Sequence, residues 1–275
     1  MIGYGCVRLT SCKSLSEAQS LVKHVISAGI RYFDTAPSYG RGYSEKILGT
    51  CLQHSGLRRE DLIIATKLGG FAQKNSKIPI ALALAFKELQ RRLRNTRPNK
   101  LLLDTSAQAS AQSGPISSYE VNIDDVKASV HRSLKSLKTD YIDILLLHEA
   151  LPSFLTNDAL EYVKDLKKSG LAKQIGIAAN GCNYESLCEE DIHEWDILQY
   201  EYGPAWPSHY SFRNKFPSKQ HVLHSCVGHR YNYDLNPIDC LKSVIKEFPE
   251  ATVLFSSLNK QHISANAAIV KSSTP

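Results

Sequence analysis

A carboxylate, a phenol and an ammonium follow short apolar runs in the first quarter of the chain. Asp34 ends the run Ile30–Phe33, Tyr39 comes five residues later, and Lys67 ends the run Leu62–Thr66. A phenol with a pKa of about 10 is a poor acid at neutral pH, and a buried ammonium beside it should lower that pKa. A carboxylate would keep the ammonium charged and in place. The three groups predict a proton-transfer site in which Tyr39 is the general acid or base.

A histidine extends this set. His148 follows the apolar run Tyr141–Leu147 and could hydrogen-bond a substrate oxygen. Each residue alone has an ordinary interpretation: Tyr39 as a turn tyrosine, Lys67 as a surface lysine and His148 as a core histidine. Four such residues in succession at predicted strand ends favour a chemical role, because the carboxyl ends of parallel strands gather at one rim of an α/β barrel.

Apolar runs alternate with amphipathic segments along the whole chain. The predicted strands are Ile2–Cys6, Ile30–Asp34, Leu62–Thr66, Tyr141–Leu147, Gln174–Ala178, Ile197–Tyr200, Val222–Ser225 and Thr252–Phe255. Helices are predicted from the Ser14–Glu17 capping box to Gly29 and over Ser44–Gln53, Asn122–Lys138, Asp158–Lys168 (with Asn157 as its cap), Tyr184–Glu189, Pro237–Phe248 and Gln261–Val270. A (β/α)8 barrel takes about 250 residues, so residues 1–275 are predicted to form one such domain.

Residues 68–122 form a long excursion between the third strand and the helix that follows it. Its first part predicts a helix over Ile78–Leu89, whereas residues 105–118 contain few bulky side chains. Basic residues follow the helix at Arg91, Arg92, Arg94, Arg97 and Lys100. The excursion is either a surface segment with a solvated basic face or a flap at the barrel mouth. A flap would bury the apolar side chains Leu82, Leu84, Phe86 and Leu89.

Composition narrows the possible partners and compartments. The net charge of +6 is mild for 275 residues and compatible with anionic ligands. Seven scattered cysteines without a CxxC motif argue against a disulfide framework or a metal site and favour reduced thiols in the cytoplasm. No apolar run approaches the roughly 18 residues of a membrane span, and the N-terminus lacks a signal-peptide pattern, so no membrane partner is expected. The basic segment 87–100 lacks interleaved aromatic residues, so no nucleic-acid partner is expected either.

From about Gly3 to Ala268 the chain resembles the aldo-keto reductases, with a pattern nearest to their aldose or sugar dehydrogenase branch. Asp34, Tyr39, Lys67 and His148 match the family's catalytic tetrad. The resemblance implies hydride transfer between NADP(H), or alternatively NAD(H), and a small carbonyl or alcohol substrate such as an aldehyde, a ketone or a sugar. The substrate, the direction of the reaction and the oligomeric state stay open.

The resemblance also implies a set of cofactor-binding residues. These are Gly5, Asn180, Gln199, His224, Ser225, Gly228, Ser257, His262 and Asn266. Gly3 and Gly5 would let a cofactor ring approach the first strand. His224 stands where the family has a stacking aromatic residue, and Asn180 lies in GIAAN in place of a Ser-Asn pair.

The segment expected to bind the cofactor's 2′-phosphate departs from the family pattern. His262 replaces an arginine, although a 2′-phosphate favours Arg or Lys. Lys260 could substitute for it. NADP(H) is favoured by the resemblance, and NAD(H) is a real alternative. No GxGxxG motif indicates a Rossmann domain.

Two kinds of function are compatible with these features. The complete tetrad favours an NAD(P)-dependent oxidoreductase. The altered cofactor residues leave open a catalytically weak or non-enzymatic nucleotide-binding or regulatory barrel. Turnover of a small aldehyde with NADH or NADPH distinguishes the two.

Overall fold

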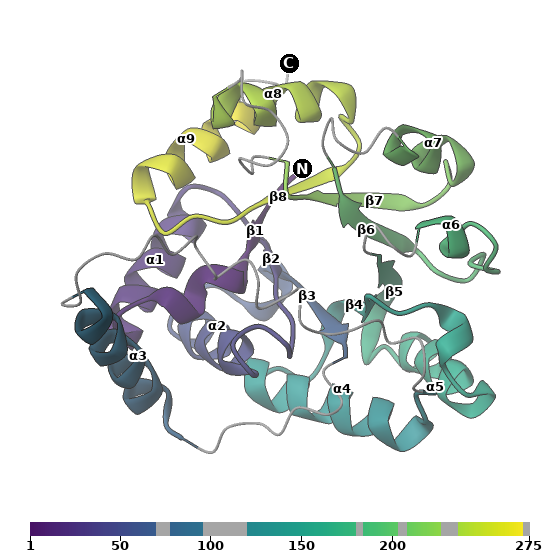
Figure 1. Ribbon diagram of the computed structural model, residues 1–275, viewed down its shortest axis with the longest axis horizontal. Coiled ribbons are helices and arrows are strands. Elements are labelled where there is room, and N and C mark those ends of the chain that lie inside the picture. The colour runs from purple at the N-terminus through teal and green to yellow at the C-terminus, as the bar shows by residue number, and fades with distance from the viewer. Residues whose placement is uncertain (70–77, 96–119, 180–183, 203–207, 227–235, 272–275) are drawn as a thin grey trace.

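The computed structural model describes residues 1–69, 78–95, 120–179, 184–202, 208–226 and 236–271 (Figure 1). Eight parallel strands follow one another around a closed barrel, and β8 pairs with β1. The strands are β1 (Ile2–Gly5), β2 (Tyr32–Asp34), β3 (Ile63–Leu68), β4 (Ile142–His148), β5 (Ala172–Ala178), β6 (Ile197–Glu201), β7 (Gln220–His224) and β8 (Thr252–Phe255). The predicted (β/α)8 fold is confirmed, and every strand boundary falls within two residues of its predicted position.

Helices surround the barrel in Figure 1. They are α1 (Leu15–Ser27), α2 (Tyr43–Gln53), α3 (Ile80–Asn95), α4 (Ile123–Leu137), α5 (Asn157–Lys168), α6 (Tyr184–Leu187), α7 (Ser208–Lys215), α8 (Pro237–Glu247) and α9 (Lys260–Lys271). Short 3₁₀ helices occur at η1 (Cys6–Ser11), η2 (Arg59–Asp61) and η3 (Pro152–Phe154). Neither the three 3₁₀ helices nor α7 was predicted from the sequence. Within the described ranges, no helix is both long and apolar enough to cross a membrane.

Side chains from seven strands fill the barrel interior. The buried members of this inner cluster are Tyr32, Ala65, Ile144, Leu146, Ala178, Ile197, Val222 and Leu254. A Cβ on Gly3 would lie 2.6 Å from Leu254 and 2.8 Å from the ring of Tyr32. Gly3 therefore makes room for these side chains inside the barrel.

The inner cluster fixes where the candidate residues point. Alternate residues of a strand face the same side, so a residue two positions beyond an inward-facing one also faces inward. Asp34, Lys67, His148, Gln199 and His224 each stand two positions beyond a member of the cluster, toward the carboxyl end of the strand. The strand period thus brings five predicted site residues to one layer at the barrel mouth.

Side-chain caps fix several helix starts. Ser14 accepts a hydrogen bond from the backbone N–H of Glu17 at 3.1 Å, as in the predicted capping box. Glu17 accepts from the N–H of Lys13, one residue before the cap, instead of from Ser14. At α5 the predicted cap is wrong by one residue. The hydroxyl of Thr156 accepts from Ala159 N–H, and Thr156 has an extended backbone, so Asn157 is already helical.

The helix predicted inside the excursion is present as α3, and it packs on α1, α2 and η1. Leu84 is buried, but Leu82, Phe86 and Leu89 are 61%, 60% and 53% exposed, so their predicted burial is wrong. Only one face of α3 turns toward the barrel, and Figure 1 shows the helix outside α1 and α2 rather than across the strands. The predicted return segment 105–118 lies outside the described residues.

Gly49 supplies a test of how α2 packs on α4. A Cβ at this position would lie 2.5 Å from the carbonyl oxygen of Ser136 and 2.6 Å from that of Leu137. Without this clash, Gly→Ala inside a helix should stabilise the protein. We expect Gly49→Ala to lower the free energy of unfolding by about 1–3 kcal/mol, measured by urea denaturation. Thr50→Ala on the same helix is the control, and equal or greater stability of Gly49→Ala would contradict the close approach.

Candidate functional site

The centre of the candidate site is a buried ion pair between β2 and β3. Lys67 Nζ donates to both carboxylate oxygens of Asp34 at 2.8 Å and to the carbonyl oxygen of Thr35 at 2.9 Å. Asp34 and Lys67 are 3% and 2% exposed. Burial alone lowers the pKa of Lys67, but Asp34 and then Tyr39 outweigh burial and raise that pKa above its ordinary value. The lysine therefore stays an ammonium ion at neutral pH.

Tyr39 lies in the turn between β2 and α2, held by a hydrogen bond from its N–H to the carbonyl oxygen of Ala36. Lys67 Nζ is 5.2 Å from the centre of its ring. Burial is the largest influence on Tyr39 and raises its pKa, whereas the charge of Lys67 and a hydrogen bond from it lower that pKa. Lys67 thus acts in the predicted direction, but the expected net lowering is wrong, because desolvation of the phenolate is the larger effect.

His148 lies beside Tyr39 at the end of β4. The two rings meet edge to face, with centroids 6.0 Å apart and planes at 86°. His148 Nδ1 is 3.3 Å from the hydroxyl of Ser38. Burial, followed by the charge of Lys67 and then His224, lowers the pKa of His148 to about 3. The imidazole is consequently neutral at physiological pH, with one ring nitrogen able to donate and the other able to accept.

Gln199 joins the ion pair from β6. Its Nε2 donates to Asp34 Oδ2 at 3.2 Å, and the residue is 2% exposed. Its Oε1 is buried and has no hydrogen-bond partner among the described residues. An unsatisfied buried acceptor is costly, so the site favours a ligand with an N–H donor here. The carboxamide of nicotinamide has such a donor and fits the expected role of Gln199.

Two further candidates lie at the end of β7. His224 Nδ1 is 3.0 Å from the hydroxyl of Ser225, and Ser225 has a left-handed backbone with φ of 63°. Such a conformation is uncommon for a residue other than glycine, and strained residues often occur at ligand sites. His224 is close enough to His148 to influence its pKa, so it belongs to the same mouth.

The predicted phosphate-binding residues lie apart from the tetrad candidates, after β8. Ser257 accepts from Asn259 N–H through its hydroxyl and from the phenol of Tyr4 through its carbonyl oxygen. His262 on α9 is exposed, whereas Asn266 is 8% exposed.

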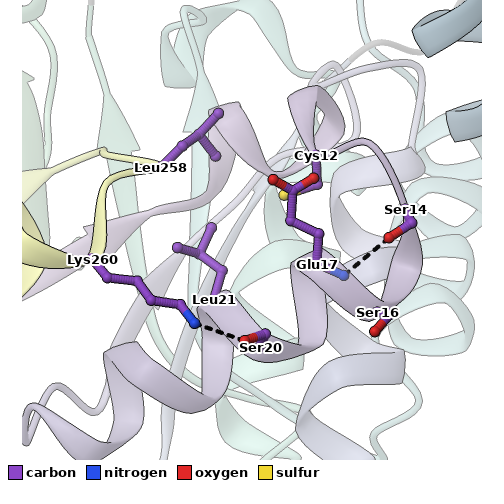
Figure 2. A pocket seen from close by; sticks show the side chains of 8 residues that line it. All are labelled: Cys12, Ser14, Ser16, Glu17, Ser20, Leu21, Leu258 and Lys260. Carbon is purple, nitrogen blue, oxygen red and sulfur yellow. Dashed lines mark hydrogen bonds between the residues drawn. The ribbon is translucent and has the colours of Figure 1, made fainter.

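The side chain of Lys260 forms a hydrogen bond with helix α1. Figure 2 shows its side chain directed to Ser20 of α1, and Nζ donates to the Ser20 hydroxyl at 2.7 Å. This contact lies at a cleft of about 460 Å³ between α1 and the β8–α9 loop, which Glu17 also lines. The backbone carbonyl of Lys260 accepts from His24 Nε2 at 3.0 Å, which fixes the start of α9 against α1.

Three other residues predicted to bind the cofactor are Asn180, Gly228 and Gly5. Asn180 and Gly228 lie outside the described residues. A Cβ on Gly5 would lie 3.5 Å from the carbonyl oxygen of Phe255, an ordinary contact, so its neighbours do not require glycine there.

Several residues that support the site were not predicted from the sequence. The Thr35 carbonyl holds Lys67, and the Ser38 hydroxyl contacts His148. On the outer side of the barrel wall, the 2% exposed carboxylate of Glu45 accepts from Thr66 Oγ1 at 2.7 Å, and burial raises its pKa. The available signal was the presence of Thr35 beside Asp34, Ser38 beside Tyr39 and Thr66 beside Lys67, although adjacency does not specify a contact.

The lowered pKa of His148 predicts a pH dependence of stability. The unfolded chain binds a proton at His148 below pH 6.5, but the folded chain does so only near pH 3. Stability should therefore fall as pH decreases between these values. His221, whose pKa burial also lowers, acts in the same direction. We expect His148→Gln to reduce the difference in unfolding free energy between pH 7 and pH 5, measured by urea denaturation. The exposed His131→Gln is the control, and an unchanged difference in His148→Gln would contradict a partly buried, neutral imidazole.

Comparison with curated proteins identifies similar oxidoreductases. The chain is 29% identical to D-threo-aldose 1-dehydrogenase of Pseudomonas sp over 184 residues, which are 65% of this chain and 49% of that protein. It is 25% identical to L-galactose dehydrogenase of Arabidopsis thaliana over 182 residues, 64% of this chain and 43% of that protein. The matched region is thus less than half the length of these curated relatives.

Solved structures and a family model agree with this similarity. The fold is similar to the holo form of an aldo-keto reductase from Bacillus halodurans, with a TM-score of 0.66 and 19% identity over 98% of this chain and 86% of that one. The model described as "Aldo/keto reductase family" matches residues 1–217. Because that match includes all four tetrad candidates and most of the barrel, the chain belongs to the aldo/keto reductase family.

Proposed function

We propose that this protein is an NAD(P)-dependent oxidoreductase that interconverts a carbonyl and an alcohol. The observation that carries the proposal is the buried Asp34–Lys67 pair beside Tyr39, with a neutral His148 against the same phenol. A binding protein has no need to place a buried ammonium next to a phenol. Two relatives are named as dehydrogenases of sugars, which supports an aldose or a related small carbonyl compound as the substrate class.

Tyr39 is the proposed proton donor for carbonyl reduction and acceptor for alcohol oxidation. Loss of its proton creates a phenolate in a partly buried place, and the adjacent Lys67 ammonium stabilises that charge. Asp34 keeps Lys67 charged and directs its N–H groups. Since Tyr39 has a raised pKa in the protein alone, most of it is protonated at neutral pH, as a proton donor must be.

His148 is proposed to orient the substrate oxygen rather than to transfer a proton. With a pKa of about 3, it remains neutral during the reaction. When the Ser38 hydroxyl donates to Nδ1, Nε2 carries the hydrogen and can donate to the oxygen that Tyr39 protonates. Ser38 thus acts as a positioning residue that selects the tautomer of His148.

The bound nicotinamide would supply or accept the hydride. Gln199 would hold its carboxamide, and His224, Ser225, Ser257 and Asn266 are proposed to contact other parts of the cofactor. This chain offers few basic side chains for the 2′-phosphate of NADP(H), since Lys260 is bonded to Ser20 and His262 replaces an arginine. NADP(H) and NAD(H) are therefore proposed to bind with less discrimination than an arginine at position 262 would give.

Removal of the phenolic hydroxyl tests the role of Tyr39. Tyr39→Phe should lower turnover by about 10²–10⁴-fold, because only the proton donor is lost. The assays are L-galactose oxidation with NAD⁺ or NADP⁺ and reduction of a small aldehyde with NADH or NADPH. Cofactor affinity, measured by fluorescence titration, should stay within a few-fold of wild type.

Tyr43→Phe is the matched control, because its hydroxyl bonds the carbonyl oxygen of Ile78 outside the mouth. Full activity of Tyr39→Phe would refute the assignment. Cofactor binding by the wild type without turnover of any substrate would instead favour the regulatory or binding alternative.

A substitution on α9 tests the cofactor assignment. His262→Arg should tighten NADPH binding more than NADH binding, because a guanidinium always carries charge and can bond a phosphate through two N–H groups. The dissociation constants are measured by fluorescence titration or calorimetry. Ala268→Arg, at an exposed position on the same helix, controls for an added charge nearby. An equal change for both cofactors would show that position 262 does not face the 2′-phosphate.

A further inference from the structure

Exposed apolar side chains gather on and beside α3. Four of the large hydrophobic residues that are most exposed in the described chain occur within one short segment. They are Ile78 (56%), Leu82 (61%), Phe86 (60%) and Leu89 (53%). Val7 on η1, which packs against α3, is 45% exposed. Single exposed apolar residues are ordinary, but a contiguous group usually marks an interaction site.

The group forms one stripe along the helix. At 3.6 residues per turn, Leu82, Phe86 and Leu89 fall within an arc of roughly 60°. Leu84 is 1% exposed and lies on the opposite side, where it packs toward the barrel. The helix thus has two apolar sides, and only the side that carries Leu84 packs against the rest of the protein. Figure 1 places α3 outside α1 and α2. The three residues of the stripe are 53–61% exposed.

Basic residues accompany the stripe. The sequence of α3 contains Lys87, Arg91, Arg92 and Arg94, against a single acidic residue, Glu88. Glu88 is already paired with Arg91 at 2.9 Å, and the Arg91 side chain is still 51% exposed. Lys87 also has a basic neighbour: burial, and then the charge of Arg41, lowers its pKa. The sequence of α3 therefore carries net positive charge.

We propose that α3 is a docking surface for an anionic lipid membrane, with the protein bound at the surface rather than spanning the bilayer. Leucine and phenylalanine side chains of such a helix enter the boundary between head groups and acyl chains, while lysine and arginine side chains extend to anionic head groups. The sequence-based expectation of no membrane partner rested on the lack of a spanning run, and a helix lying in the interface does not need one. The site on α3 is separate from the proposed active site at the barrel mouth.

The charges disfavour a second copy of the chain as the occupant. Antiparallel pairing of two α3 helices would place the arginine-rich end of each against the start of the other, where the helix dipole is positive and the first turn contains no acidic residue. Parallel pairing would bring the arginines of both copies together. An anionic membrane supplies the opposite charge and, being fluid, needs no shape that matches the stripe.

Co-sedimentation with lipid vesicles tests the proposal. The full chain should pellet with vesicles of phosphatidylcholine and phosphatidylserine, and far less with phosphatidylcholine alone or at high salt. The double variant Leu82→Asp, Phe86→Asp should lose this binding, and Lys87→Gln should weaken it about fivefold. Ile238→Asp is the matched control, because it places the same charge at a 37% exposed isoleucine on α8 and should bind like the wild type.

Circular dichroism and urea unfolding verify that each variant is folded, and Leu82→Ser, Phe86→Ser replaces the aspartate variant if that one is not. Absence of binding to the anionic vesicles at low salt would overturn the proposal, as would binding that persists in the folded double variant. A dimer that forms without lipid and is lost in the double variant, seen by sedimentation velocity, would assign the stripe to a second copy instead.

Discussion

The buried ion pair of Asp34 and Lys67 is the interaction around which the candidate site is built. A charge removed from water is costly by several kcal/mol unless a partner and hydrogen bonds compensate for the lost hydration. Lys67 obtains three acceptors from Asp34 and the backbone of Thr35, and Asp34 obtains a further donor from Gln199. This arrangement needs β2, β3 and β6 to end at the same level, which only the closed barrel provides.

The charge of Lys67 in this pair affects the protonation of two neighbouring residues, Tyr39 and His148. Lys67 opposes the effect of burial on Tyr39 and, together with burial, keeps His148 neutral. The result is a phenol that can change its protonation state next to an imidazole that does not. Tyr39 and His148 thus have different roles, although both are shielded from water and both lie near the positive charge of Lys67.

The barrel was predictable because its signals are local and repeated. Buried parallel strands give continuous apolar runs, such as Tyr141–Leu147, and capping residues such as Ser14 and Asn122 mark helix starts. The positions of the four tetrad candidates followed from strand ends. The sequence did not show that desolvation would outweigh Lys67 in setting the pKa of Tyr39, because that balance depends on how completely distant segments exclude water.

Long-range contacts explain other features that were not predicted from the sequence. Gly3 is required by Leu254 and Tyr32, residues that no sequence window connects to it. Leu82, Phe86 and Leu89 were expected to be buried because they are apolar, yet burial depends on which face of α3 meets the barrel. Lys260 could be identified as the cation nearest in sequence to His262, but its bond to Ser20 comes from a helix 240 residues away.

The closure of the barrel between β1 and β8 has a consequence for how the site forms during folding. The amino group of Met1 donates to the carbonyl oxygen of Ala251, a contact across 250 residues, whereas Asp34 and Lys67 are only 33 residues apart. Since closing a longer loop costs more chain entropy, neighbouring strands are expected to pair before the ring closes. The ion pair can then exist in an open sheet, but the bond from Gln199, 165 residues from Asp34, requires the later strands. A partly folded chain would thus hold the charged pair without the amide that completes its surroundings.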